Sequence, residues 1–215
     1  MLMSNNEEDQ LKIQLASVDQ RLRTIVAGEY ITLVPLTTDH ALSFHNQYQS
    51  IGIQQMTDLP AFANVSEVCE WINEEEASKN SYNYAIELPV VGFVGFVNLI
   101  VSKHAAFFAI WLGEKFQGLG LGTQTAQIIC QHALDAKISV IFTAAFVNNQ
   151  RSIQMLKKVG FERMPISAYA PHNDRTFFIL TTDPTIKKNG NSELINFYQR
   201  EDYSFVQALK KKLMW

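Results

Sequence analysis

Three segments between residues 82 and 113 limit the possible folds of this chain most strongly. Their sequences, "YNYAIEL", "VGFVGFVNLIVS" and "AAFFAIWLG", are rich in aromatic and β-branched residues and are separated by short breaks. Short connections join strands that run in opposite directions, so we predict three consecutive antiparallel strands. Further strand patterns, "EYITLVPLT", "ISVIFTAAF" and "RTFFILTT", lie before and after them. Together these segments predict one sheet.

Helical patterns alternate with these strands. After the first strand we predict two helices, over residues 37–48 and 66–79, with a threonine capping the first and Ser66 the second. A third helix carries one apolar stripe with helical spacing, formed by Ala126, Ile129, Cys130, Ala133 and Leu134. A fourth helix stops at Gly160. The chain is therefore predicted to form an α+β fold in which helices pack on the sheet.

The composition favours one soluble domain. A chain of 215 residues with 47% hydrophobic residues can bury one substantial core. Its 18 basic and 21 acidic residues give a net charge of -3, and no dense basic cluster suggests nucleic-acid binding. No stretch reaches the ~20 apolar residues that cross a bilayer, so we expect no membrane segment. Cys69 and Cys130 lie in apolar helical patterns without metal-ligand spacing, which predicts buried reduced thiols, no metal and a cytoplasmic protein.

Both ends of the chain extend beyond the main domain, which we place at residues 25–183. Residues 1–24 are polar and have a weak helical pattern. In the C-terminal extension, residues 184–215, "DPTIKKNGNSEL" leads in as a loop, and Asp202 can cap a terminal helix. The residues on one face of that helix would be Val206, Leu209 and Leu213. We expect the helix to dock on its own domain; covering the substrate cleft or pairing two subunits is the alternative.

The segment "FQGLGLGTQTAQ", residues 116–127, places three glycines at alternate positions just before the third helix. Glycines allow a tight turn and let backbone N–H groups approach a ligand without interference from side chains. Because a helix begins directly after them, its first N–H groups and its dipole converge on the same place, which suits a pyrophosphate. An ordinary glycine-rich turn between strand and helix is the alternative.

Two common phosphate-binding motifs do not fit this loop. A dinucleotide fingerprint has a third glycine where Thr123 stands, and it follows its strand directly, whereas "EKFQ" intervenes here. A P-loop needs a lysine followed by serine or threonine after its last glycine, but Gly122 is followed by Thr123 and Gln124. The remaining pattern is Q-x-x-G-x-G, formed by Gln117, Gly120 and Gly122.

This pattern resembles the loop with which the GCN5-related N-acetyltransferase (GNAT) superfamily holds the pyrophosphate of acetyl-CoA. A second motif of that superfamily is similar to "NNQRSIQMLKKVGF" in this chain. The matching residues are Asn149, Ser152, Gly160 and Phe161. From about Glu29 to Thr182 the layout resembles the RimJ/RimL branch, the ribosomal-protein N-terminal acetyltransferases. The resemblance implies a GNAT domain over residues 25–183, a mixed, mostly antiparallel central sheet with helices on both faces, and acetyl-CoA as cosubstrate.

The resemblance also implies a set of site residues. The backbone of Ile110, Trp111 and Leu112 would pair with the pantetheine arm as an extra strand does. The phosphates would lie on Gln117, Gly118, Leu119, Gly120, Leu121, Gly122 and Thr123. Asn149 and Ser152 would lie near the thioester, with Ser152 as the possible general acid for the leaving thiolate. Simpler roles are open: Asn149 can be an N-cap, Ser152 the third residue of that helix, and Trp111 a core residue.

The catalytic positions depart from the superfamily. Leu156 stands where a tyrosine often acts as general acid, and Phe107 where the RimJ/RimL branch commonly has an acidic residue. Glu87, as a weak candidate for the base, His104 and Asn98 could act through water instead. For all three we favour structural roles: Glu87 and His104 as solvated residues at strand ends, and Asn98 as a hydrogen-bonding residue of the sheet.

The lack of an obvious base bears on the acceptor. An α-amine with a pKa of ~7.7 to 8.0 is deprotonated at pH 7 at a cost of ~1.4 kcal/mol, whereas a lysine at ~10.4 requires ~4.6 kcal/mol. We therefore expect an N-acetyltransferase that acts on a peptide α-amine, a small amine or an amino sugar in preference to lysine, by direct attack in a ternary complex. A catalytically silent CoA-binding sensor or assembly module is the alternative. Relatives suggest a monomer or homodimer.

Two segments are expected to govern substrate choice: "SIGIQQMTDLPAFANV", residues 50–65, and "MPISAYAPHND", residues 164–174. Neither carries a readable specificity code. Tyr169 and His172, in the second segment, either line the acceptor cleft or only pack and cap the loop.

Overall fold

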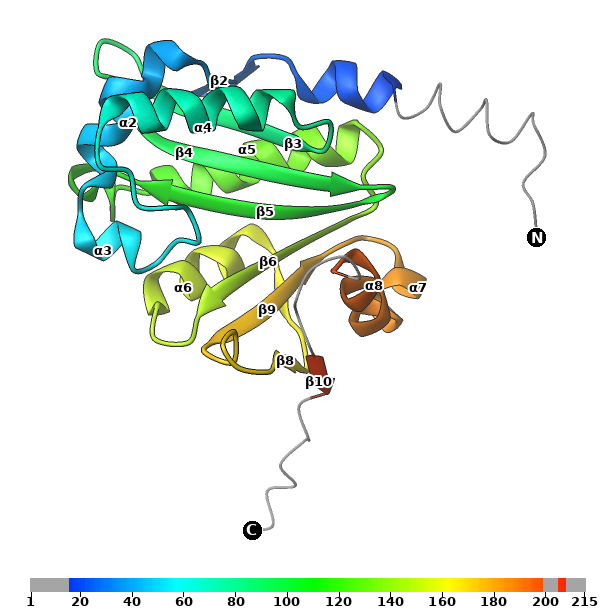
Figure 1. The fold of residues 1–215 in the computed structure, drawn as a ribbon. Helices are drawn as coiled ribbons and strands as arrows, with labels where there is room; N and C mark the ends of the chain where they lie inside the picture. Colours follow the sequence, from blue (N-terminus) through cyan, green and yellow to red (C-terminus); the bar gives the residue numbers. More distant parts are fainter. Residues whose placement is uncertain (1–15, 199–204, 208–215) are drawn as a thin grey trace.

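An eight-stranded sheet lies at the centre of the molecule (Figure 1). The computed structural model describes residues 16–198 and 205–207. The strands follow one another across the sheet in the order β1 (Val26–Ala27), β2 (Thr32–Pro35), β3 (Ser81–Leu88), β4 (Gly92–Ser102), β5 (Ala105–Leu112), β6 (Val140–Phe146), β9 (Arg175–Leu180) and β7 (Glu162–Arg163). Neighbouring strands run antiparallel except β5 and β6, which are parallel. The predicted mixed, mostly antiparallel sheet is therefore confirmed.

Helices cover both faces of this sheet, as expected (Figure 1). On one face lie α2 (Ala41–Tyr48) and α4 (Val65–Ala77), and on the other face lie α5 (Leu121–Asp135) and α6 (Gln150–Val159). Phe44 of α2 and Trp111 of β5 belong to the aromatic core beneath the first pair. Ile129 of α5 and Leu156 of α6 belong to the core on the opposite face. The apolar stripe predicted for the third helix is thus the buried side of α5.

Two helices differ in how closely their ends follow the local sequence signals. The prediction that Ser66 caps the helix over residues 66–79 is wrong, because the Asn64 side chain takes that role. Its Oδ1 accepts a hydrogen bond from the N–H of Glu67 at 3.1 Å, so α4 begins at Val65. The predicted stop at Gly160 is confirmed: the residue ends α6 with φ +104°, a conformation that glycine adopts without strain.

Part of the predicted N-terminal extension packs on the main core. Residues 16–22 are helical, and Val18 and Leu22 are buried in the same core as α5. The hydroxyl of Tyr84 donates a hydrogen bond to the carbonyl oxygen of Leu22. These contacts fix the short helix against β3.

The two cysteines differ in burial. Cys130 on α5 is 2% exposed, and burial raises the pKa of its thiol, so the predicted buried thiol is confirmed there. Cys69 on α4 is only half-buried, and neither cysteine forms a disulfide. Among the described residues no three His, Cys, Asp or Glu side chains are grouped to hold a metal ion. None of the helices in those ranges is long and apolar enough to cross a membrane.

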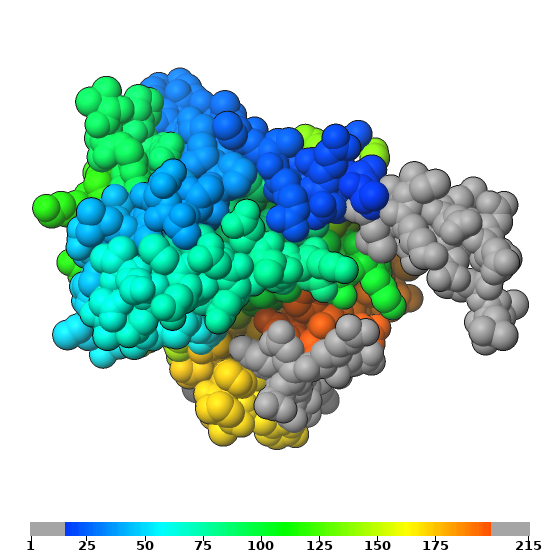
Figure 2. Space-filling model, turned by 45° about the horizontal axis from the view of Figure 1, so that its top comes forward, coloured from blue at the N-terminus to red at the C-terminus, as the bar shows by residue number. Residues whose placement is uncertain are grey.

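The C-terminal extension contains helices where a loop was predicted. The segment "DPTIKKNGNSEL" forms α7 (Pro184–Lys188) and most of α8 (Gly190–Phe197). Asp183 caps α7 by accepting hydrogen bonds from the first turn, and Pro184 occupies a position that favours helix initiation. Figure 2 shows these orange helices beside the green end of β4 and β5, where His104 Nε2 and Glu193 Oε2 lie 3.3 Å apart.

The predicted terminal helix is wrong where the structure describes it. Phe205–Gln207 forms strand β10, which pairs antiparallel with β8 (Ile166–Ala168). Val206 therefore lies in a strand and not in a helix. The other residues of the prediction, Asp202, Leu209 and Leu213, lie outside the described residues.

Candidate functional site

The parallel strands β5 and β6 separate partway along their length. They pair only over Ala105–Phe107, and just beyond this point the hydroxyl of Thr143 donates a hydrogen bond to the carbonyl oxygen of Phe108 at 2.8 Å. From Ala109 onward β5 has no strand partner on its β6 side within the described chain. An extended ligand can therefore pair with the backbone of β5 there as an added strand would.

A cavity of about 640 Å³, which we call the loop cavity, opens beside the diverging strands. It is lined by most of the residues that the resemblance implied for the cofactor: Ile110, Trp111, Leu112, Gln117, Gly118, Gly120, Gly122, Thr123, Asn149 and Ser152. Leu119 and Leu121 do not line it. Leu119 is 67% exposed, and Leu121 packs against the core under α5.

The glycine loop presents its backbone to this cavity. It follows the short helix η2 (Glu114–Phe116) and leads into α5. Gly118 and Gly120 have φ of +80° and +85°, which side-chain-bearing residues rarely adopt. No described residue accepts a hydrogen bond from the N–H groups of residues 118–122. Successive unpaired N–H groups at the positive end of a helix dipole suit an anion such as a pyrophosphate.

Gln117 connects the loop to its surroundings. Its Nε2 donates a hydrogen bond to the carbonyl oxygen of Leu112 at 2.9 Å, and its Oε1 accepts one from Arg151 at 2.8 Å. Arg151 and Lys158, both on α6, line the loop cavity and add positive charge to it. Neither cation was predicted as a site residue, although both lie inside the second motif.

The start of α6 also faces the loop cavity. Asn149 Oδ1 accepts a hydrogen bond from the N–H of Ser152 at 3.0 Å, so the N-cap expected as a simpler role is confirmed. Asn149 and Ser152 also line the loop cavity, so the helix cap is compatible with contact to a ligand there. Trp111 is 6% exposed and packs edge-on against Phe44, with ring centres 5.0 Å apart. It is thus a core residue that also forms a cavity wall.

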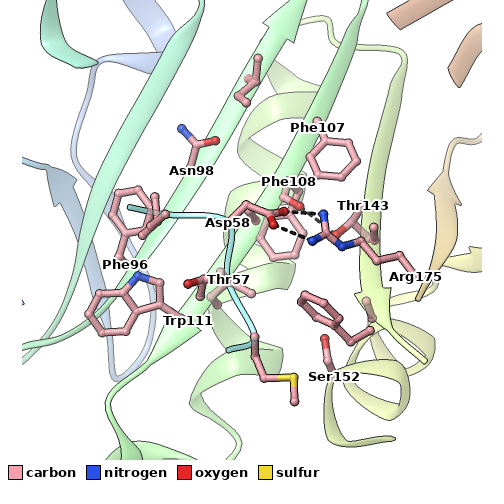
Figure 3. A pocket seen from close by; sticks show the side chains of 18 of the residues that line it. Thr57, Asp58, Phe96, Asn98, Phe107, Phe108, Trp111, Thr143, Ser152 and Arg175 are labelled. Carbon is pink, nitrogen blue, oxygen red and sulfur yellow. Dashed lines mark hydrogen bonds and ion pairs between the residues drawn. The ribbon is translucent and has the colours of Figure 1, made fainter. Parts of the chain in front are cut away.

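A second cavity of about 320 Å³, which we call the sheet cavity, lies on the same diverging strands (Figure 3). One wall is polar and is formed by Glu75, Ser81, Asn83 and Asn98. Aromatic side chains also line the cavity and include Phe107, Phe197 and Tyr198. The two cavities share Met56, Thr57, Ile110, Trp111, Asn149, Ser152 and Met155. They therefore meet where β5 and β6 have separated.

An ion pair lies beside the sheet cavity (Figure 3). Two nitrogens of Arg175 donate hydrogen bonds to the two carboxylate oxygens of Asp58, each at 2.6 Å. The guanidinium lies over the ring of Phe146, 4.6 Å from its centre. Asp58 belongs to the segment that follows α3 (Ile51–Gln54), within residues 50–65, which were expected to govern substrate choice.

Only some of the candidate acid and base positions line a cavity. Leu156 and Phe107, which stand where the resemblance leads us to expect a tyrosine and an acidic residue, both line the sheet cavity. Glu87 lines neither cavity; its Oε1 lies 3.4 Å from Nε2 of His40. His104 lies at the β4–β5 turn beside Glu193, as described above. Of the three substitutes, only Asn98 reaches the site.

The second substrate segment contributes less than expected. Tyr169 is 54% exposed, and neither it nor His172 lines the loop cavity or the sheet cavity. Arg175, the first residue of β9, directly follows this segment and supplies the cavity wall instead. The C-terminal helix α8 adds Phe197, which the sequence did not predict.

Comparison with known proteins identifies the fold. The sequence profile of the family described as "Acetyltransferase (GNAT) domain" matches residues 31–162. A search of curated proteins found no match. Among solved structures, the microcin C7 self-immunity acetyltransferase MccE, in complex with acetyl-CoA and AMP, has a TM-score of 0.64 and 21% identity, with 72% of this chain and 93% of that chain covered.

Two ribosomal-protein acetyltransferases are also similar. RimL, the ribosomal L7/L12 α-N-protein acetyltransferase in complex with coenzyme A, has a TM-score of 0.67 and 18% identity, with 74% of this chain and 98% of that chain covered. The ribosomal-protein-S5-alanine acetyltransferase from Vibrio fischeri has a TM-score of 0.66 and 13% identity, with 75% of this chain and 98% of that chain covered. At such identities the likeness concerns the fold. The family profile spans more than half of the sequence, and the chain therefore belongs to the GNAT family of acetyl-CoA-dependent acetyltransferases.

Proposed function

We propose that the loop cavity binds acetyl-CoA, that the sheet cavity binds a primary amine, and that the acetyl group is transferred where the two cavities meet. The observation that carries this proposal is the shared wall that includes Ile110, Trp111, Asn149 and Ser152. A ligand in each cavity would approach the other only there. This arrangement supports direct attack in a ternary complex, without an acetylated enzyme.

The residues of the loop cavity suit the cofactor. The N–H groups of residues 118–122 would bind the pyrophosphate, and the cations of Arg151 and Lys158 would bind further phosphate charge. The unpaired edge of β5, over residues 110–112, would hold the pantetheine arm. Gly118 and Gly120 have no other atom near the position that a side chain would occupy. They therefore leave room for the pyrophosphate to approach the backbone closely.

Bound acetyl-CoA would supply a thioester carbon, to which the amine nitrogen bonds as the carbon–sulfur bond breaks. The amine loses a proton in this step and the sulfur gains one. Ser152 lies at the junction, and its hydroxyl has no hydrogen-bond partner among the described residues. Ser152 is therefore the proposed proton donor to sulfur, and Asn149 holds it in place through the helix cap.

The shared wall contains no titratable side chain that could serve as a base. Its members are Met56, Thr57, Ile110, Trp111, Asn149, Ser152 and Met155. A positioned base typically contributes ~10² to 10⁴-fold, so its lack favours amines that lose their proton easily. We therefore place peptide α-amines, small amines and amino sugars ahead of lysine side chains as acceptors.

Initial rates on two matched peptides test this function. One peptide has an unblocked N-terminus and no lysine, and the other has an acetyl-blocked N-terminus and one lysine. We expect thiol release with the first peptide at a rate at least tenfold higher, since ~3.2 kcal/mol separates the deprotonation costs. Preference for the blocked peptide would overturn the choice of acceptor. Lack of thiol release with any amine would overturn the reaction itself.

A further inference from the structure

Four polar side chains form a connected network on the wall of the sheet cavity. Glu75 comes from α4, Ser81 and Asn83 from β3, and Asn98 from β4. The Ser81 hydroxyl donates a hydrogen bond to Glu75 Oε2 at 2.7 Å, and Asn83 Nδ2 donates one to the same oxygen at 3.2 Å. Asn98 Nδ2 donates hydrogen bonds to Ser81 Oγ at 2.9 Å and to Asn83 Oδ1 at 2.7 Å.

The carboxylate of Glu75 fixes the orientation of both amides. An ionised carboxylate can only accept hydrogen bonds, so Asn83 must turn its NH₂ group toward Glu75 and its oxygen toward Asn98. Asn98 must then donate with its own NH₂ group. Its Oδ1 is left without a donor among the described residues, although the residue is only 9% exposed. Figure 3 shows this oxygen on the side of Asn98 nearer Phe107 and Phe108.

Ser81 is saturated and cannot relay a proton. Its hydroxyl donates to Glu75 and accepts from Asn98 and from Asn83, the latter at 3.2 Å. A hydroxyl has one donor proton and two acceptor sites, so no position remains for the acceptor amine. The network therefore has the properties of a binding surface and not of a proton path.

The sheet cavity carries a negative charge from Glu75. The other charged residues of its lining, Asp58 and Arg175, neutralise each other. No described cation lies within ion-pair distance of Glu75. Arg23 borders a different pocket, which Glu75 also lines, and is paired with Asp19 at 2.8 Å. A cationic group of a ligand could therefore interact with Glu75 without displacing a partner.

The register of the sheet gives the separation between this network and the reaction site. Asn83 pairs with Asn98, and Asn98 pairs with Ala109, two residues beyond Phe107, the last residue of β5 that pairs with β6. Adjacent strands lie ~4.8 Å apart, so Asn83 is about 10 Å from β5. An acceptor whose reacting amine lies beside β5 and whose other end reaches Asn83, at the Glu75 network, thus spans about 10 Å.

We propose that this network binds a second, cationic group of the acceptor, about 10 Å from the amine that is acetylated. The Asn98 oxygen and the Glu75 carboxylate would accept hydrogen bonds from a protonated amino or guanidinium group. An elongated diamine and a peptide with a basic side chain near its N-terminus share this chemistry. The inference rests on the proposed use of the sheet cavity for the acceptor.

Calorimetric titration of the CoA-saturated protein tests this inference without turnover. The probes are octane-1,8-diamine and octylamine, which differ in the distal cation. We expect the wild type to bind the diamine roughly ten- to a hundredfold more tightly, the range for hydrogen bonds to charged groups. Glu75→Gln keeps an oxygen for Ser81 but loses the charge, so the preference should disappear. Glu74→Gln, on the exposed side of the same helix, should keep it.

The outcomes separate this inference from the proposed function. Two results would overturn the role of the network: equal binding within both probe pairs, the amine pair and the peptide pair described next, or an unchanged preference in Glu75→Gln. A peptide pair with lysine or norleucine as the second residue distinguishes the two sources of the cation, and selectivity in either pair supports the inference. Thiol release is measured in parallel, so that failed acetyl transfer with intact binding selectivity would count against the proposed reaction alone.

Discussion

Ser152 combines two roles through different atoms. Its backbone N–H completes the cap of α6 by donating to Asn149, while its hydroxyl remains at the junction of the loop cavity and the sheet cavity. Asn98 has a similar dual character, since it joins a hydrogen-bond network of the sheet and turns its oxygen to a cavity. At both residues, the hydrogen bonds that stabilise the fold also fix the position of an oxygen that faces a cavity.

Replacing Ser152 tests the proton donor. Ser152→Ala keeps the backbone N–H and thus the cap, so the fold and the affinity for CoA should not change. We expect kcat to fall about a hundredfold, the lower end of the range for general acid catalysis. Steady-state kinetics and calorimetry measure the two quantities, with Ser167→Ala, which lines neither cavity, as the control. An unchanged kcat would mean that solvent supplies the proton.

Among the elements, the glycine loop and α5 act as one unit. The positive φ of Gly120 turns the chain so that α5 starts at Leu121 and the N–H groups of residues 118–122 remain unpaired within the described structure. A bound anion would satisfy those groups. The conformation of the backbone, more than any side chain, is therefore the expected source of affinity for phosphate.

A matched pair of glycine substitutions tests the loop. Gly120 and Gly92 have similar φ, +85° and +79°, and neither has another atom close to its side-chain position. Alanine at either site costs about 1–2 kcal/mol of backbone strain. At residue 120 this strain is relieved by moving the loop away from the conformation that binds CoA. If ~1.4 kcal/mol is relieved in this way, binding must restore it, so we expect Gly120→Ala to raise the Kd for CoA about tenfold. Gly92→Ala, at the β3–β4 turn, should destabilise the fold without changing this Kd; equal effects on Kd would contradict the assignment of the loop.

Sequence predicted those elements whose signals are local. The strands from β3 to β5, the stripe of α5 and the stop at Gly160 follow from periodicity and composition within short windows. The ion pair of Arg175 with Asp58 was not predictable, because it joins residues that are 117 positions apart. The Glu75 network likewise depends on α4 lying beside β3. Local signals alone do not decide between Ser66 and Asn64 as the cap, because Asn64, two residues earlier, offers an equally good acceptor oxygen.

At the scale of the whole molecule, one parallel contact in an otherwise antiparallel sheet creates the site. β5 and β6 pair over only three residues before they diverge, and both cavities use the resulting gap. Elements from distant parts of the chain then close the sheet cavity: the segment after α3, α4 and the C-terminal helix α8. In the proposed function, the GNAT core provides the place for the cofactor, and the surrounding elements shape the place for the acceptor.

Thermal unfolding with acetyl-CoA, CoA, NADH and ATP tests most directly whether the loop cavity holds CoA. A ligand specific to the native state stabilises it by ~2.7 kcal/mol at a hundredfold excess over Kd. For a chain of this size that corresponds to a rise in Tm of roughly 5 to 10 °C. We predict this rise with acetyl-CoA and CoA and a much smaller one with NADH and ATP. An unchanged Tm with both CoA species would contradict the proposal that residues 117–123 bind the pyrophosphate of CoA.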